Sequence, residues 1–212
     1  MLILASQSPR RKQLLELSRW KFSVLPVDID ESVKVGEAPG IYVARMAEEK
    51  AAAAHARVVD RTNTGDLIIG ADTAVVDWQP AIKEIKEDPA GGPPDEKTSG
   101  SYRILGKPGD SFEAQKMLRE LRGRTHQVYS AVAVLLAQEG RPVSDVCITD
   151  VPMREYSDEE ISTYTASGDP LDKAGAYAIQ HSGFNPVHNL QGCYANVMGL
   201  PLCHLTRLLM RF

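Results

Sequence analysis

The run from Leu67 to Val76 constrains the fold more than any other feature of this sequence. Its letters are LIIGADTAVV, and such an apolar, partly β-branched run is typical of a strand inside a sheet. One carboxylate, Asp72, lies among nine non-acidic neighbours. An ion buried there costs several kcal/mol unless it is paired or metal-bound. We therefore expect a central strand in which Asp72 forms a structural salt bridge, binds a metal or acts as a general base.

Helices and strands alternate along the rest of the chain. We expect further strands at residues 2–5, 22–26, 127–137 and 143–152, and two short ones at 176–180 and 187–190. We expect helices at residues 9–18, 39–57, 110–123, 157–168 and 200–210. This order predicts an α/β fold whose twisted sheet is flanked by helices, and the short connections between some strands predict that the sheet is mixed.

The stretch from Gln79 to Ser101 differs in composition from its surroundings. It is rich in proline, glycine and mixed charge, and it has too little apolar surface to pack. We interpret it as a surface insertion in an otherwise single domain of residues 1–212.

Charge and hydropathy exclude several classes of protein. The 24 basic and 28 acidic residues give a net charge of −4, which argues against binding a nucleic-acid polymer through its phosphates. The apolar run Met1–Ala5 is far too short for a signal peptide, and no run approaches the roughly 20 residues needed to cross a membrane. We expect a cytoplasmic protein that does not enter a membrane.

Two arginines open the first expected helix. Arg10 and Arg11 lie where the helix dipole disfavours cations, beside the hydroxyls of Ser6 and Ser8. These groups and the free N–H groups of the helix could form a phosphate cradle. A solvated basic turn explains the same pattern.

Three other charged positions each allow two interpretations. Lys50 lies on the apolar stripe of its helix, so it either snorkels or faces a polar cleft. Lys107 lies between a glycine and a proline, in a rigid cation site or an ordinary turn. The acidic loop of Asp28, Asp30 and Glu31 could offer oxygen ligands to Mg²⁺ or Mn²⁺, or be a solvated loop.

Five segments in their order along the chain resemble the motifs of the Maf (septum-formation protein) family. They are residues 4–11 (LASQSPRR), 70–73 (GADT), 105–108 (LGKP), 169–180 (DPLDKAGAYAIQ) and 192–202 (GCYANVMGLPL). The resemblance spans nearly the whole chain. It implies a Maf/ITPase-like fold of two lobes around a nucleotide-binding cleft, a homodimer, and nucleoside triphosphate pyrophosphatase activity at the bond between the α and β phosphates.

The resemblance also assigns roles to single residues. It implies active-site positions for Glu31, Lys50, Asp72 and Lys107, with Asp72 as proton acceptor. We therefore predict Asp72, Lys50 and Lys107 as catalytic residues, and Glu31 and Asp72 as ligands of Mg²⁺ or Mn²⁺. The resemblance implies substrate binding by the remaining members of the site, which are Ser6, Arg10, Arg11, Thr73 and Gln180.

Arg10, Thr73 and Gln180 look like the branch of the family that acts on dTTP and UTP, because the 7-methyl-GTP branch tends to carry Trp, Gln and Glu there. One departure is that Asp72 and Lys107 are farther apart in sequence than is usual in the family, because residues 79–101 intervene. The alternative function is a nucleotide-binding regulator of cell division that acts through a protein partner.

Overall fold

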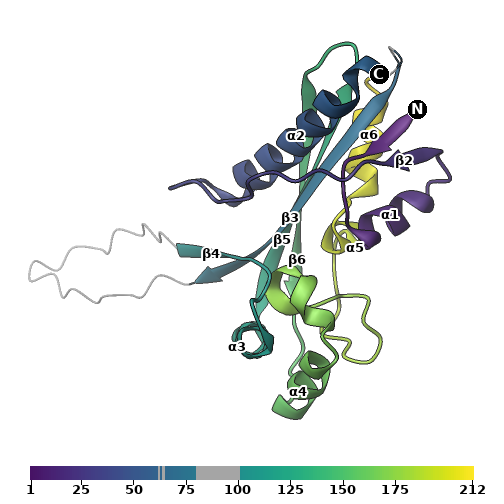
Figure 1. Cartoon of the computed structure of the whole chain (residues 1–212). Coiled ribbons are helices and arrows are strands. Elements are labelled where there is room, and N and C mark those ends of the chain that lie inside the picture. Colours follow the sequence, from purple (N-terminus) through teal and green to yellow (C-terminus); the bar gives the residue numbers. More distant parts are fainter. Residues whose placement is uncertain (62, 64, 80–100) are drawn as a thin grey trace, which may run out of the picture.

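A mixed sheet, with six strands in the described part of the chain, forms the frame of the protein (Figure 1). The computed structural model describes residues 1–61, 63, 65–79 and 101–212. The strand order is β2-β1-β3-β5-β6, and β4 also pairs with β3. The strands are β1 (Leu2–Leu4), β2 (Phe22–Val24), β3 (Leu67–Gln79), β4 (Ser101–Leu105), β5 (Thr125–Leu136) and β6 (Pro142–Pro152). The α/β fold with a mixed sheet, predicted from the alternation of elements, is confirmed.

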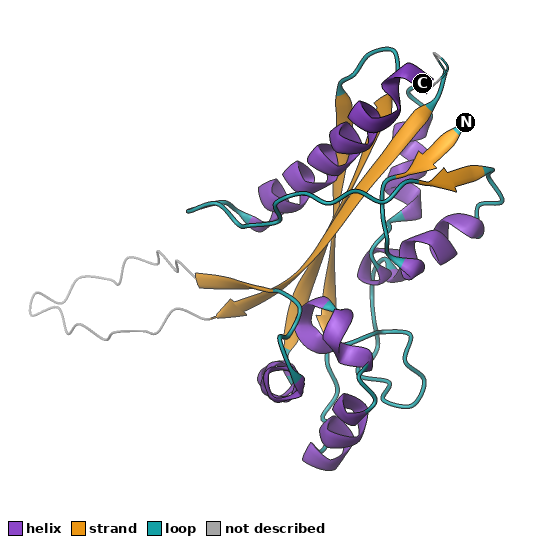
Figure 2. Cartoon of the chain, in the orientation of Figure 1, coloured by secondary structure: helices purple, strands orange, loops and turns teal. Residues whose placement is uncertain are grey.

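The described residues form six α-helices, which are distributed over both faces and one end of this sheet (Figure 2). They are α1 (Pro9–Glu16), α2 (Pro39–Val58), α3 (Ser111–Leu121), α4 (Asp158–Ala166), α5 (Tyr194–Met198) and α6 (Leu202–Leu209). Short 3₁₀ turns occupy Val59–Arg61, Asp169–Asp172 and Ala174–Ala176. No helix in the described part of the chain is long and apolar enough to span a membrane.

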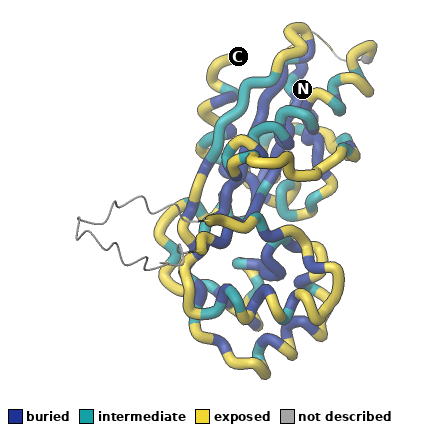
Figure 3. Tube along the Cα trace, turned by 90° about the vertical axis from the view of Figure 1, so that its left-hand side faces the viewer, coloured by how far each residue is buried: buried dark blue, intermediate teal, exposed yellow. Residues whose placement is uncertain are grey.

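Neighbouring side chains of β3 enter different cores because a strand turns successive residues to opposite faces. Ile68 packs with Met46 and other residues of α2, whereas Ile69 packs with Leu15 of α1 and Leu205 of α6. A third core joins α3 and α4 to the far ends of β3, β5 and β6. These cores divide the molecule into two lobes along one long sheet (Figure 3).

The edge of β3 that faces away from β5 is occupied in two separate places. β1 pairs in parallel with residues 67–69, and β4 pairs antiparallel with residues 75–79. Among the described residues no strand pairs with this edge between positions 70 and 74. The sheet is therefore open on one side at the boundary between the lobes, around Asp72.

The predictions of two short strands are wrong. Residues 176–180 do not form a strand, because Gly175 and Ala176 have φ angles of 68° and 60°, and this left-handed backbone interrupts an extended chain. In residues 187–190 the only pairing in the described part is an isolated bridge from Val187 to Met153. The short helix α5, which Cys193 caps, was not expected.

The expected insertion lies largely outside the described residues. Its first and last positions, Gln79 and Ser101, belong to β3 and β4 and face each other in the antiparallel register. Residues 80–100 connect these paired ends, and their role stays a prediction, as does the single-domain organisation.

Candidate active site

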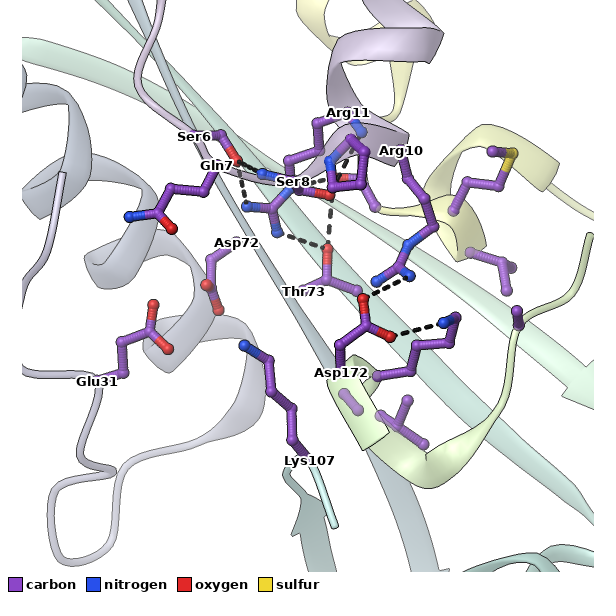
Figure 4. Close-up of a pocket in the computed structure, with 18 of the residues that line it drawn as sticks. Ser6, Gln7, Ser8, Arg10, Arg11, Glu31, Asp72, Thr73, Lys107 and Asp172 are labelled. Carbon is purple, nitrogen blue, oxygen red and sulfur yellow. Dashed lines mark hydrogen bonds and ion pairs between the residues drawn. The ribbon is translucent and has the colours of Figure 1, made fainter. Parts of the chain in front are cut away.

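A cavity of about 550 Å³ opens at the gap in the edge of β3 (Figure 4). Asp72 and Thr73 both line it although they point to opposite faces of the strand, which requires an open edge. Both lobes contribute to its walls. Every residue assigned a site role from the sequence lines this cavity: Ser6, Arg10, Arg11, Glu31, Lys50, Asp72, Thr73, Lys107 and Gln180.

The ammonium group of Lys50 joins two carboxylates in the cavity. Its Nζ lies 2.6 Å from Oδ1 of Asp72 and 2.6 Å from Oε1 of Glu31. Lys50 and Asp72 are only 7% and 6% exposed, so this lysine does not snorkel to the surface. The salt bridge considered for Asp72 exists, and it lies in the cavity, where the same carboxylate can meet a ligand.

The two carboxylates differ in their acidity. Burial raises the pKa of Asp72 above its ordinary value, against the opposing charges of Lys50 and Arg11. Burial also acts to raise the pKa of Glu31, but the hydrogen bond and charge of Lys50 outweigh it and the pKa is lowered. The pKa values of the two carboxylates are therefore shifted in opposite directions, and burial favours the protonated form of Asp72.

Arg11 is fixed in place by three oxygens. Its Nε donates to the carbonyl of Gly199 at 2.9 Å, Nη1 to Oγ of Ser6 at 3.3 Å and Nη2 to Oγ1 of Thr73 at 3.2 Å. Its charge is therefore held at the wall of the cavity. Burial lowers the pKa of Arg11 from its ordinary value, while Asp72 and Glu31 act to raise it.

The start of α1 supplies the second part of the cradle expected from the sequence. Ser8 caps the helix and its Oγ accepts from the N–H of Arg11 at 3.4 Å, while Oγ of Ser6 accepts from the N–H of Ser8 at 3.2 Å. The structure thus places a helix N-terminus and two guanidinium groups around one cavity, and this arrangement favours the binding of an anion.

Thr73 connects the cavity to a buried polar network. Its hydroxyl lies 2.8 Å from the hydroxyl of Ser130, which donates to the carbonyl of Asn196 at 2.9 Å. The amide of Asn196 in turn donates to Oγ1 of Thr149 at 2.8 Å. The hydroxyl of Thr73 therefore holds Arg11 directly and connects to α5 through Ser130.

Lys107 and Gln180 border the cavity from the second lobe. Lys107 follows β4, and Figure 4 shows its side chain directed toward the same space as Asp72 and Glu31. Gln180 is exposed at the rim.

Sequence reasoning did not assign a role to Asp172 or Lys173. Asp172 lies 3.7 Å from Nη1 of Arg10, and Nζ of Lys173 lies 2.6 Å from Oδ1 of Asp172. The sequence signal was the pairing of an aspartate and a lysine in the DPLDKAG run. The sequence spacing alone did not place these two residues in the cavity, because their position depends on the 3₁₀ turn of residues 169–172.

The donor set fits a divalent cation that shares its ligands with a substrate. Within the described residues, no group of three His, Cys, Asp or Glu side chains could hold a metal ion. Mg²⁺ is commonly bound by one or two carboxylates together with substrate phosphates. Glu31 and Asp72 meet this requirement because both carboxylates lie within 2.6 Å of one cation, Nζ of Lys50, and so are close enough to each other to share a metal ion.

The comparisons with known proteins agree over the full length. The family described as "Maf-like protein" matches residues 1–212. A protein named "dTTP/UTP pyrophosphatase" from Bacillus cereus (strain B4264) is 38% identical over 211 residues, covering 100% of this chain and 95% of the relative. Proteins of the same name from Anaeromyxobacter dehalogenans (41%, 99% and 93% covered) and Xanthomonas axonopodis pv. citri (39%, 100% and 98% covered) are similar over 212 residues. The chain belongs to the Maf-like protein family.

Proposed function

We propose that this protein hydrolyses nucleoside triphosphates, with dTTP and UTP as substrates, to the monophosphate and pyrophosphate. The observation that carries the proposal is the cavity in which Asp72, Lys50 and Glu31 face Arg10, Arg11 and Lys107. Full-length relatives named dTTP/UTP pyrophosphatase support the same reaction and substrates. We also propose that the protein acts in the cytoplasm as a homodimer.

Asp72 is the proton acceptor in this proposal. It takes a proton from the water that attacks the α-phosphorus, and its raised pKa brings it closer to the operating pH than an ordinary aspartate. Lys50 holds the carboxylate in place through the 2.6 Å contact. When the proton has moved to Asp72, the ammonium of Lys50 remains paired with Glu31.

The cations of the cavity stabilise charge on the phosphates. Arg11 is held by its three hydrogen bonds, so it offers charge that needs no rearrangement during the reaction. Lys107 faces the cavity from the other lobe, where its ammonium group can neutralise charge on the leaving pyrophosphate. Glu31 and Asp72 would hold Mg²⁺ or Mn²⁺, which supplies Lewis-acid charge to the phosphate oxygens when bound.

Arg10 and Gln180 are proposed to select the base. An arginine offers several N–H donors in a fixed plane, and a glutamine offers a donor and an acceptor, which suits the mixed edge of thymine or uracil. A purine leaves some of these groups unpaired, at a cost of about 1–3 kcal/mol per lost contact. We propose that the preference also depends on Thr73, because its hydroxyl fixes Arg11, the residue next to Arg10 on α1.

The test is a release assay with dTTP, UTP, ATP and 7-methyl-GTP in the presence of Mg²⁺ or Mn²⁺. Added inorganic pyrophosphatase converts the product to phosphate, and omitting it shows whether pyrophosphate leaves as one unit. We expect kcat/KM to be highest for dTTP and UTP. Preference for 7-methyl-GTP would reject the substrate assignment, and binding without turnover of any nucleotide would reject the enzyme in favour of a nucleotide-binding regulator.

A further inference from the structure

We propose that Asp172 is a positioning residue that holds the guanidinium of Arg10 in the cavity across the cleft between the lobes. The inference rests on the proposed function for its kinetic consequences. Arg10 belongs to the first turn of α1, whereas Asp172 ends the 3₁₀ turn of residues 169–172 in the other lobe. Their charged groups approach to 3.7 Å, and Figure 4 shows both side chains at the wall of the cavity.

Arg10 needs an anchor because its surroundings repel it. It lies at the positive end of the α1 dipole, and the first turn of that helix contains no acidic residue. Arg11 adds a second guanidinium beside it. Without an opposing carboxylate, the side chain of Arg10 would be drawn away from the cavity into solvent.

Asp172 is itself held by a buried cation, the ammonium group of Lys173. Its second oxygen, Oδ1, lies 2.6 Å from Nζ of Lys173, whose side chain is only 8% exposed. Lys173 also pairs with Oδ1 of Asp169 at 3.0 Å, and Asp169 accepts from the hydroxyl of Tyr164 at 2.8 Å. The carboxylate that meets Arg10 is therefore fixed through a chain of contacts that reaches the core of the second lobe.

Stability does not explain this arrangement. The side chain of Asp172 is 62% exposed, and ion pairs of that exposure contribute between about 0 and 1 kcal/mol. A carboxylate at the wall of a cavity that receives a triphosphate also repels the substrate. The contact is understandable if Asp172 occupies one edge of the Arg10 guanidinium and leaves the other N–H donors directed at the ligand.

The experiment is a double-mutant cycle of Asp172→Asn and Arg10→Met, with Asp158→Asn as the matched control. Asp172→Asn keeps the shape and removes the charge, and Arg10→Met removes the guanidinium. Asp158 is a similarly exposed carboxylate of the second lobe, but it pairs with Arg119 and Arg122 and does not line the cavity. For each protein, kcat and KM for dTTP and the melting temperature are measured.

We expect Asp172→Asn to raise KM for dTTP about fivefold or more and to change kcat by less than about twofold, because it acts on binding. In the Arg10→Met background the same change should add less than about twofold to KM. Asp158→Asn should leave KM within about twofold of the wild type. A normal KM in Asp172→Asn, or an undiminished effect in the Arg10→Met background, overturns the inference.

A readout without turnover separates this inference from the proposed function. Nitrogen-15 NMR of the Arg10 Nε–H reports whether the side chain is held, whatever the protein hydrolyses. We expect Asp172→Asn to shift this signal and to speed its exchange with water, and Asp158→Asn to change it little. If the wild type cleaves none of the four nucleotides, the proposed function fails, and an unchanged Arg10 signal in Asp172→Asn would separately refute the positioning role.

Discussion

A single ammonium group organises the reacting part of the cavity. Lys50 contacts both Asp72 and Glu31, so neither carboxylate is left without a partner when the other is neutralised. Breaking a buried ion pair by removing one partner usually costs about 3–5 kcal/mol. Here the remaining carboxylate reduces that cost, and single substitutions at this site can be studied in a folded protein.

Asp72→Asn should keep the fold and lower kcat by a factor of about 10² or more, because it removes the proton acceptor and one metal ligand. The measurement is kcat for dTTP together with the melting temperature. The control is Asp77→Asn on the same strand, since Asp77 is 1% exposed, pairs with Arg124 at 2.8 Å and does not line the cavity. Asp77→Asn should lower stability and leave kcat within about twofold. Near-normal turnover in a folded Asp72→Asn protein would remove Asp72 from the mechanism.

His126 should make the fold sensitive to acid. It is 1% exposed, and burial lowers its pKa from 6.5 to about 3, with a further contribution from the charge of Arg124. The unfolded chain therefore binds a proton that the folded protein does not. Stability is complete above about pH 6.5 and falls by at most about 1.4 kcal/mol per unit as the pH drops toward 3.

The variant His126→Gln removes this titration and can keep a hydrogen bond to the hydroxyl of Tyr177, which lies 2.8 Å from Nε2. Urea unfolding at pH 7, 6, 5 and 4 gives the free energy of unfolding of both proteins. We expect the wild type to lose more stability than the variant between pH 6 and pH 4. Parallel pH dependences would show that His126 does not titrate in this window.

Residue chemistry singled out several charged members of the cavity more readily than their partners, whereas Thr73 and Gln180 were predicted only from the family resemblance. Asp72 and Lys50 were conspicuous because each places a charge on an apolar face, which is costly without a partner. The contact of Arg10 with Asp172 joins positions 162 residues apart through an exposed turn, and nothing in the local pattern of either segment indicates it. Costly residues can be recognised one by one, whereas pairings across lobes depend on the tertiary fold.

At the scale of elements, the packing of α2 against β3 sets the distance between Lys50 and Asp72. Gly70 lies on the face of β3 that α2 covers, and a Cβ added there would lie 2.0 Å from the carbonyl oxygen of Ala47 and 2.8 Å from the N of Ala51. Both of these atoms belong to the helix backbone, so they cannot rotate away. The glycine lets the helix approach closely enough for a lysine to reach the strand.

Gly70→Ala should therefore destabilise the protein by roughly 3 kcal/mol, because an overpacked core must shift its backbone. Displacing α2 also moves Lys50 from Asp72, and we expect kcat to fall about tenfold or more. Urea unfolding and dTTP turnover measure the two effects. Gly65→Ala is the matched control, because a Cβ there meets no atom within 4 Å and should change neither quantity. Wild-type stability in Gly70→Ala would show that the close approach is not required.

The elements themselves followed the sequence where periodicity and caps agreed. The expected helix of residues 157–168 is α4, with a capping box between Ser157 and Glu160. The predictions failed where short apolar runs were interpreted as strands, at residues 176–180 and 187–190. Both runs belong to the core around α3 and α4, and their one pairing among the described residues is the bridge from Val187 to Met153, so burial explains their apolar composition.

At the scale of the whole molecule, the cavity exists because two strands share one edge of β3 without meeting. The lobe around α1, α2 and α6 supplies Glu31, Asp72 and most of the cations, and the lobe around α3 and α4 supplies Asp172, Lys107 and the rim. Both termini lie at the end of the sheet away from α3 and α4 (Figure 1). The boundary between the lobes is thus the place where relative movement would change the site most.

Replacing residues 80–100 by Asn-Gly should leave a folded and active enzyme. Gln79 and Ser101 are partners in the antiparallel register of β3 and β4, and a two-residue turn of this type connects such a pair. β4 remains held by its pairing and by the hydroxyl of Tyr102, which donates to the carbonyl of Glu37 at 3.1 Å. We expect a melting temperature within a few degrees of the wild type and kcat/KM for dTTP within about threefold, since a shorter closed loop costs less entropy. Loss of folding would make the replaced segment structural, and loss of activity in a folded protein would give it a part in the site.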